Sequence, residues 1–242
     1  MMQSTFLQRI NIIILFSLAC FGAKAQGDAP KYLYEIGGML GGSFYMGDAN
    51  KNTIFRNMNP TGGAIFRYNI DFRTAIKANL IWARVTGSTA GLENVFPDNA
   101  QASFERNVID IGGQMEFNFF PYSDEFKYLN TKRVSPYILG GIGLSAAPGN
   151  GDTFFSPHIS IGTGVKYKLK PRINIGAEFS IRKLFGDGLD VSPGNNLLDN
   201  PYQMESGWMK NKDWYSMLTI FVTYDFGLRN CNCNRSDMNR LY

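Results

Sequence analysis

Residues 108–120 read VIDIGGQMEFNFF, and apolar and polar residues alternate along this stretch. The apolar or small set comprises Ile109, Ile111, Gly113, Met115, Phe117 and Phe119. The polar or small set comprises Asp110, Gly112, Gln114, Glu116 and Asn118. A period of two predicts a β-strand with one apolar and one polar face. A strand of an outer-membrane barrel satisfies both faces, because lipid contacts the apolar face and the polar face lines the lumen.

Seven further segments have the composition of strands. They span residues 33–45, 62–68, 74–85, 135–146, 156–168, 173–184 and 214–226. The connections after the first, third and seventh strands are long, and those after the second and sixth are short; we assign the turn-rich connection after the fifth strand to the long set and the charged connection 121–134 to the short set. An even-stranded barrel with both termini in the periplasm has this alternation. The sequence therefore predicts an all-β protein, an eight-stranded antiparallel transmembrane β-barrel of the outer membrane, over residues 26–228.

A soluble eight-stranded barrel of the lipocalin type is the alternative fold, with its apolar residues inside. Two features favour the membrane barrel. The apolar faces carry aromatic residues at the strand ends, as in the girdles of membrane barrels, and the polar faces are too thin to cover a whole exterior.

The lumen of an eight-stranded barrel is just wide enough for its own side chains. We therefore expect the charged residues of the polar faces to pair across it, which argues against a porin. These residues are Asp110, Glu116, Lys166, Glu178 and Arg182.

The first 25 residues have the pattern of a secretory signal peptide. Arg9 supplies the positive charge, an apolar run follows, and Ala23, Lys24 and Ala25 form a small-residue cleavage site. The alternative is a lipoprotein anchored through Cys20, but the residues before it lack the expected leucine. Cleavage would lower the formal charge from +4 to about +2, which is too small for a nucleic-acid-binding protein.

Two cysteines, Cys231 and Cys233, lie in a polar C-terminal tail of residues 229–242. A bond between them would close a strained small ring, so a covalent tether to a partner is the functional interpretation in an oxidising compartment. Two thiols with a distant histidine are a poor metal site, and we expect neither a metal nor a cofactor.

His158 and Ser160 share the polar face of one predicted strand. Lipid-modifying barrels use serine, histidine and a carboxylate, but the spacing shows neither a carboxylate near His158 nor an exposed nucleophile. We therefore expect no enzymatic activity and no catalytic residue.

Several segments, in this order, resemble the PorG family, a small outer-membrane barrel of the Bacteroidetes type IX secretion system. The segments are Tyr34-Glu35-Ile36-Gly37, Gly41-Gly42-Ser43-Phe44-Tyr45-Met46-Gly47-Asp48, Arg67-Tyr68-Asn69, Phe117-Asn118-Phe119-Phe120-Pro121-Tyr122, Ser135-Pro136-Tyr137-Ile138, Asp213-Trp214-Tyr215 and Tyr224-Asp225-Phe226. The resemblance covers nearly the whole mature chain.

The resemblance implies a non-enzymatic protein that links the outer membrane to a periplasmic ring of the PorK lipoprotein and PorN, while the secreted substrate passes through a separate, larger barrel. Apart from the two short turns, the parts of this chain that would face the ring are a charged connection and the tail with Cys231 and Cys233. The charged residues of that connection are Asp124, Glu125, Lys127, Lys132 and Arg133. A small adhesin or membrane-stabilising barrel, acting through the loops 87–107 and 186–213, is the rival interpretation.

Overall fold

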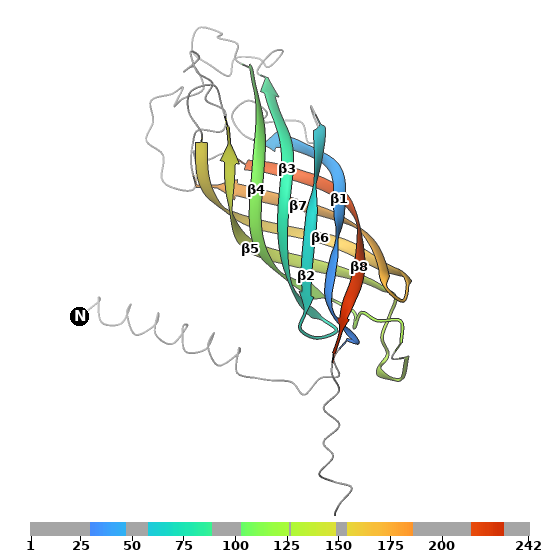
Figure 1. Ribbon diagram of the computed structural model, residues 1–242. Coiled ribbons are helices and arrows are strands. Elements are labelled where there is room, and N and C mark those ends of the chain that lie inside the picture. Colours follow the sequence, from blue (N-terminus) through green and yellow to red (C-terminus); the bar gives the residue numbers. More distant parts are fainter. Residues whose placement is uncertain are drawn as a thin grey trace, which may run out of the picture.

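The computed structural model describes residues 30–46, 58–88, 103–125, 127–148, 154–185 and 214–229. Its strands are β1 (Tyr32–Met46), β2 (Asn59–Asn69), β3 (Thr74–Ser88), β4 (Ser103–Asn118), β5 (Val134–Ala147), β6 (Phe154–Lys170), β7 (Ile173–Leu184) and β8 (Trp214–Leu228), with a short 3-10 helix η2 (Lys127–Leu129) between β4 and β5. Each strand pairs antiparallel with the next, and β8 pairs with β1 to close the barrel (Figure 1). The predicted eight-stranded antiparallel barrel is confirmed.

The predicted strand boundaries are less accurate at the C-terminal end of β3 and the N-terminal end of β4. Residues 87–88 and 103–107 were predicted as loop, but the register from Ser88↔Ser103 to Arg84↔Asn107 makes them part of the β3–β4 ladder. Backbone pairing needs no apolar side chain, and the exposed ion pair between Arg84 and Glu105 joins the two strands there. At the other end, β4 stops at Asn118, two residues before the predicted boundary.

The polarity of the barrel is the reverse of that of a soluble protein. Large apolar side chains face outward, including Leu40 at 69%, Ile142 at 71% and Phe155 at 70% exposure, whereas Asp110 and Glu116 inside are fully buried. Soluble monomers rarely expose apolar patches above a few hundred Å², and this one encircles the barrel. Lipid is the environment that satisfies such an exterior, so the fold is a transmembrane barrel. In the described part of the chain, no helix has the length and hydropathy needed to cross a bilayer.

Aromatic side chains mark one rim of the apolar band. Tyr34, Phe66, Tyr68 and Phe226 form a cluster, with ring centroids 5.5–6.4 Å apart. On β8, Trp214 lies twelve residues from Phe226, which corresponds to about 40 Å along a strand and about 30 Å upright at a tilt of ~40°. This spacing fits girdles that flank the apolar core of a bilayer.

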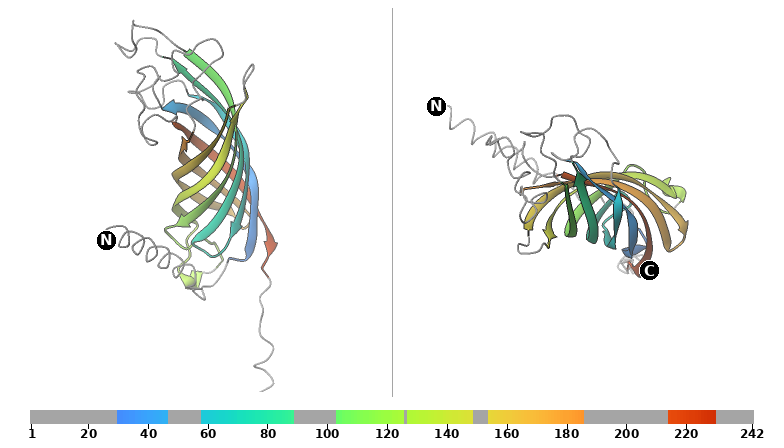
Figure 2. Two further views of the ribbon diagram at one scale, coloured as in Figure 1. Left: turned by 90° about the vertical axis from the view of Figure 1, so that its left-hand side faces the viewer. Right: turned by 90° about the horizontal axis from the view of Figure 1, so that it is seen from above.

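We call the end of the barrel that carries Tyr32 and Leu228 the terminal end, and the opposite end the distal end. The β2–β3 and β6–β7 turns and the β4–β5 connection lie at the terminal end, as Figures 1 and 2 show.

Inward-facing glycines allow neighbouring strands to approach closely at sharp bends of the wall. A Cβ atom on Gly37 would lie 1.9 Å from the Val222 carbonyl oxygen, and one on Gly41 would lie 2.0 Å from that of Leu218, so neither site has room for a side chain. The close approach of β1 to β8 therefore requires glycine at both positions. By contrast, Gly113 faces outward, with no atom within 4 Å of its Cβ position.

Candidate functional site

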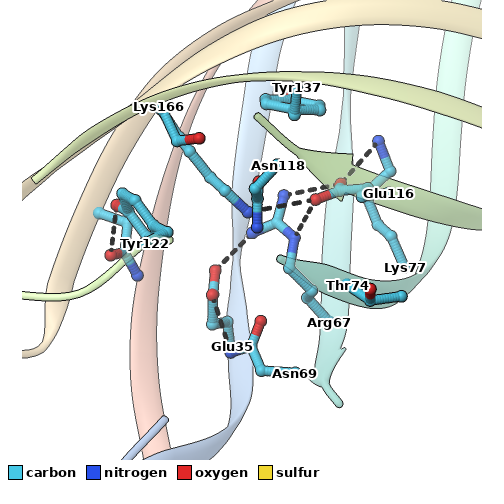
Figure 3. A network of polar contacts seen from close by, with 12 residues as sticks. Glu35, Arg67, Asn69, Thr74, Lys77, Glu116, Asn118, Tyr122, Tyr137 and Lys166 are labelled. Atoms are coloured by element: carbon cyan, nitrogen blue, oxygen red, sulfur yellow. Dashed lines mark hydrogen bonds and ion pairs between the residues drawn. The ribbon is translucent and has the colours of Figure 1, made fainter. Parts of the chain in front are cut away.

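The lumen near the terminal end contains a buried cluster of charges centred on Arg67 of β2 (Figure 3). The guanidinium donates from Nε and Nη2 to the two carboxylate oxygens of Glu116, at 2.8 and 3.0 Å. Nη1 donates to Glu35, whose other oxygen accepts from Asn69 at 3.0 Å. The inward positions of β1, β2 and β4 bring these residues together, so one arginine joins the carboxylates of two other strands.

Two lysines extend this cluster across the lumen. Lys77 lies 2.7 Å from Glu178 and 3.5 Å from Glu116, and Lys166 lies 3.4 Å from Glu116. The Tyr137 hydroxyl donates to Glu178 at 2.7 Å. We name the six charged residues the terminal cluster: Glu35, Arg67, Lys77, Glu116, Lys166 and Glu178. Its three carboxylates face three cations, which compensates the cost of burying each charge.

A second polar group, the distal cluster, surrounds Asp110 and comprises Asp110, Ser145, His158, Arg182 and Tyr215. Asp110 accepts from Tyr215 at 2.6 Å, from Ser145 at 3.0 Å and from Arg182 at 3.3 Å. The predicted pairing of charges across the lumen is therefore present in both clusters: Glu116 with Lys166, Glu178 with Lys77, and Asp110 with Arg182.

His158 has the carboxylate that the sequence did not reveal. Its Nδ1 lies 3.3 Å from Asp110 and 3.1 Å from the Ser145 hydroxyl, while its Nε2 has no hydrogen-bond partner among the described residues. A catalytic triad instead places the carboxylate and the nucleophile on different ring nitrogens. Ser145 is also only 1% exposed and donates to Asp110, and Ser160 accepts from Gln114. Among the described residues, this arrangement is a buried hydrogen-bond network and lacks the geometry of a triad.

Buried apolar side chains, together with neutral polar ones, occupy other parts of the described lumen. The apolar side chains form one buried cluster that includes Met39, Ile65, Ile81, Val85 and Phe221. Ile81 and Val85 interrupt the alternation of the third predicted strand, and the structure gives the reason, because both face inward and pack in this cluster.

The β4–β5 connection covers the terminal mouth of the barrel. Tyr122 is 7% exposed, its amide donates to the Phe72 carbonyl at 3.0 Å, and its hydroxyl donates to Asn174 at 2.8 Å. The ammonium groups of Lys166 and Lys168 lie 5.0 and 5.4 Å from the centre of its ring. Burial raises the pKa of the Tyr122 hydroxyl, which keeps it a donor. The space left at this mouth is about 30 Å³, enough for about one water.

Several predicted partner-binding residues lie around this covered mouth. Glu125 forms an ion pair of 2.9 Å with Lys31, and this hydrogen bond raises the pKa of Lys31. Asp124 lines the small space beneath, the ammonium of Lys132 lies 4.2 Å from the Phe120 ring centre, and Arg133 is exposed.

Lys127 begins η2, whose Tyr128 is 78% exposed. Outside the described residues lie Cys231 and Cys233, the predicted signal peptide with Cys20, and residues 89–102 and 186–213 of the predicted loops. Within the described segments, no group of three or more His, Cys, Asp or Glu side chains could hold a metal ion.

A barrel filled in this way should not conduct ions. We expect the purified protein, reconstituted in a planar bilayer, to give no discrete current steps under conditions in which a trimeric porin conducts. The physical reason is that two ion-paired clusters, an apolar cluster and Tyr122 occupy successive parts of the lumen. Stable, repeated channel openings would contradict this interpretation.

Comparison with known proteins gives a family and a set of similar folds. A family model described as "Domain of unknown function (DUF6089)" matches residues 8–235. Comparison with curated protein sequences finds no significant match.

Among solved structures, the chain is similar to Neisserial surface protein A (NspA), with 13% identity, coverage of 80% of this chain and 97% of that chain, and a TM-score of 0.48. It is similar to Ail, the attachment invasion locus protein of Yersinia pestis, with 13% identity, coverage of 82% and 100%, and a TM-score of 0.42. It is also similar to the outer membrane protein OprG from Pseudomonas aeruginosa, with 11% identity, coverage of 83% and 98%, and a TM-score of 0.43.

Proposed function

We propose that this chain, which belongs to the DUF6089 family, is a non-enzymatic outer-membrane barrel of the type IX protein secretion machinery. In this proposal both termini are periplasmic, and the terminal end links the outer membrane to the periplasmic ring of PorK and PorN. The proposal rests on the resemblance of the sequence to the PorG family.

One structural observation supports a linking role over transport or catalysis. Paired charges, neutral polar groups and apolar side chains occupy the described lumen, and the β4–β5 connection covers its mouth. A barrel whose lumen is occupied by its own side chains would act through its outer surfaces, namely the lipid-facing wall and the two ends. At the terminal end, the β4–β5 connection presents exposed charges, including Lys132 and Arg133.

In this mechanism the barrel fixes a position in the bilayer and the mouth docks on the ring. Charged groups on a rim give orientation and association rate more than affinity. Cys231 and Cys233, on the tail that follows β8, would add a covalent tether to a periplasmic partner.

Affinity purification in mild detergent tests this function. We expect large periplasmic proteins to co-purify with the wild-type barrel, and the double variant Lys132→Glu/Arg133→Glu to retain at least about tenfold less of them, because it reverses two charges in the proposed contact. The matched control Arg84→Glu/Glu105→Arg alters an exposed pair near the distal end and should co-purify normally.

A non-reducing gel of membranes gives a second readout. Cys231→Ser/Cys233→Ser should remove a species of higher mass if the tail is tethered. Unchanged secretion after deletion of the protein, with loss of surface attachment, would contradict the secretion role and favour the adhesin.

A further inference from the structure

The outer wall of the barrel contains an apolar groove of about 930 Å³. It crosses β6, β7, β8, β1 and β2, and its outward-facing lining includes Leu40, Val165, Ile175, Ala177, Ile220 and Val222. The groove lies on the lipid-facing surface, since Leu40 and Ile220 are 69% and 67% exposed.

Two outward-facing glycines leave a gap between the side chains of this part of the wall. Gly38 and Gly62 are both part of the lining, on the neighbouring strands β1 and β2. The nearest atom to a Cβ on Gly38 would be the Gly63 carbonyl oxygen at 3.7 Å, an ordinary contact. A larger residue at position 38 would therefore fit the backbone and project into the groove.

A fixed cation lies at the terminal end of the groove. Along β7 and β8 the outward pairs are Ala177↔Ile220, Ile175↔Val222 and then Ile173↔Tyr224, so the groove leads toward Tyr224. Arg172 directly precedes Ile173 and is exposed.

Two tyrosine hydroxyls position this arginine. Arg172 donates from Nε to Tyr32 and from Nη1 to Tyr224, both at 3.0 Å. Its Nη2 donates to no acceptor within the described segments, and the exposed Lys170 lies two residues earlier on the same turn. Along the wall, the apolar groove leads to an aromatic rim and then to cations. A phospholipid has complementary groups in the same order, because its apolar acyl chains lead to a polar headgroup.

We propose that this groove binds a phospholipid, with an acyl chain against Gly38, Ile175 and Val222 and its anionic headgroup on Arg172 and Lys170. The guanidinium suits a phosphate because it donates several hydrogen bonds in a fixed plane. With the terminal end in the periplasm, as the proposed function has it, this lipid belongs to the inner leaflet of the outer membrane; that assignment alone rests on the proposed function.

Native mass spectrometry of the full chain in detergent tests the proposal, with dioleoylphosphatidylglycerol or dioleoylphosphatidylcholine added. We expect one retained lipid per barrel, with the anionic lipid preferred. Arg172→Gln and Lys170→Gln should each weaken retention of the anionic lipid about fivefold and that of the zwitterionic lipid less, because its choline ammonium offsets the charge of the phosphate.

Filling the groove tests the acyl-chain contact separately. Gly38→Leu should abolish retention of both lipids, whereas Gly113→Leu, on the outward face of β4 and outside the groove, should not. If Gly38→Leu does not fold, as judged by loss of its heat-dependent shift on a gel, Ala177→Leu fills the same groove.

Equal retention of the two lipids by the wild type, or retention that survives both filling variants, would overturn the proposal. A doubled mass in place of bound lipid would assign the groove to a second copy of the chain. No ring protein is present in this measurement, so its result is independent of the co-purification experiment.

Discussion

Replacement of Arg67 by methionine is expected to destabilise the folded barrel by about 3–5 kcal/mol, the cost of breaking a buried ion pair by removing one partner. The variant leaves Glu35 and Glu116 side by side in the lumen without the guanidinium that joins them. Lys77 and Lys166 remain near Glu116, but neither replaces the hydrogen bonds from Arg67. Urea unfolding in detergent micelles, followed by tryptophan fluorescence, measures the change.

The matched control is Arg84→Met. Arg84 also pairs with a glutamate, Glu105, but their side chains are 43% and 57% exposed. Exposed pairs contribute about 0–1 kcal/mol, so this variant should unfold at nearly the wild-type urea concentration. Equal effects of the two substitutions would show that the terminal cluster does not stabilise the fold as described.

Gly37→Val is expected to prevent formation of the closed barrel. Its side chain would have to occupy space held by the Val222 carbonyl and the Thr223 backbone on β8. Backbone atoms cannot rotate away as side-chain ends can, so the clash opposes the β1–β8 pairing that closes the sheet. The expected observation is loss of the faster-migrating folded band when unheated samples are run on a denaturing gel.

Gly113→Val is the control for this substitution, because the position faces outward with no atom within 4 Å of a Cβ. It adds the same isopropyl group to another glycine of the barrel wall and should leave the folded band intact. A folded Gly37→Val variant would mean that β1 and β8 lie farther apart than the structure shows.

The alternation of side chains along residues 108–120 was sufficient to predict the barrel, because lipid and lumen impose opposite demands on neighbouring residues. That charged residues of the polar faces pair across the lumen also followed, since a narrow lumen leaves them few other partners. Which residues pair, such as Asp110 with Arg182 and Glu116 with Lys166, came only from the structure. The central role of Arg67 was not predicted, because contacts across the lumen depend on how far each strand is shifted along its neighbour.

Two other features lacked a local sequence signal. Tyr122 follows a proline in a polar connection, and nothing in that composition indicates that its ring enters the mouth of the barrel. The carboxylate near His158 comes from Asp110, 48 positions earlier in the chain. Both contacts become visible only once the register of all eight strands is known.

Hydrogen bonds at the covered mouth join segments that lie far apart in the sequence. Tyr122 bonds to Phe72 and Asn174, and Arg229 beyond β8 donates to the carbonyl of Asn69 at 2.9 Å. A partly formed sheet does not bring these groups together. The surface at this end therefore forms only when β8 has paired with β1. Any protein that recognises it would select completed copies and pass over those still being inserted, so the terminal end itself reports successful assembly.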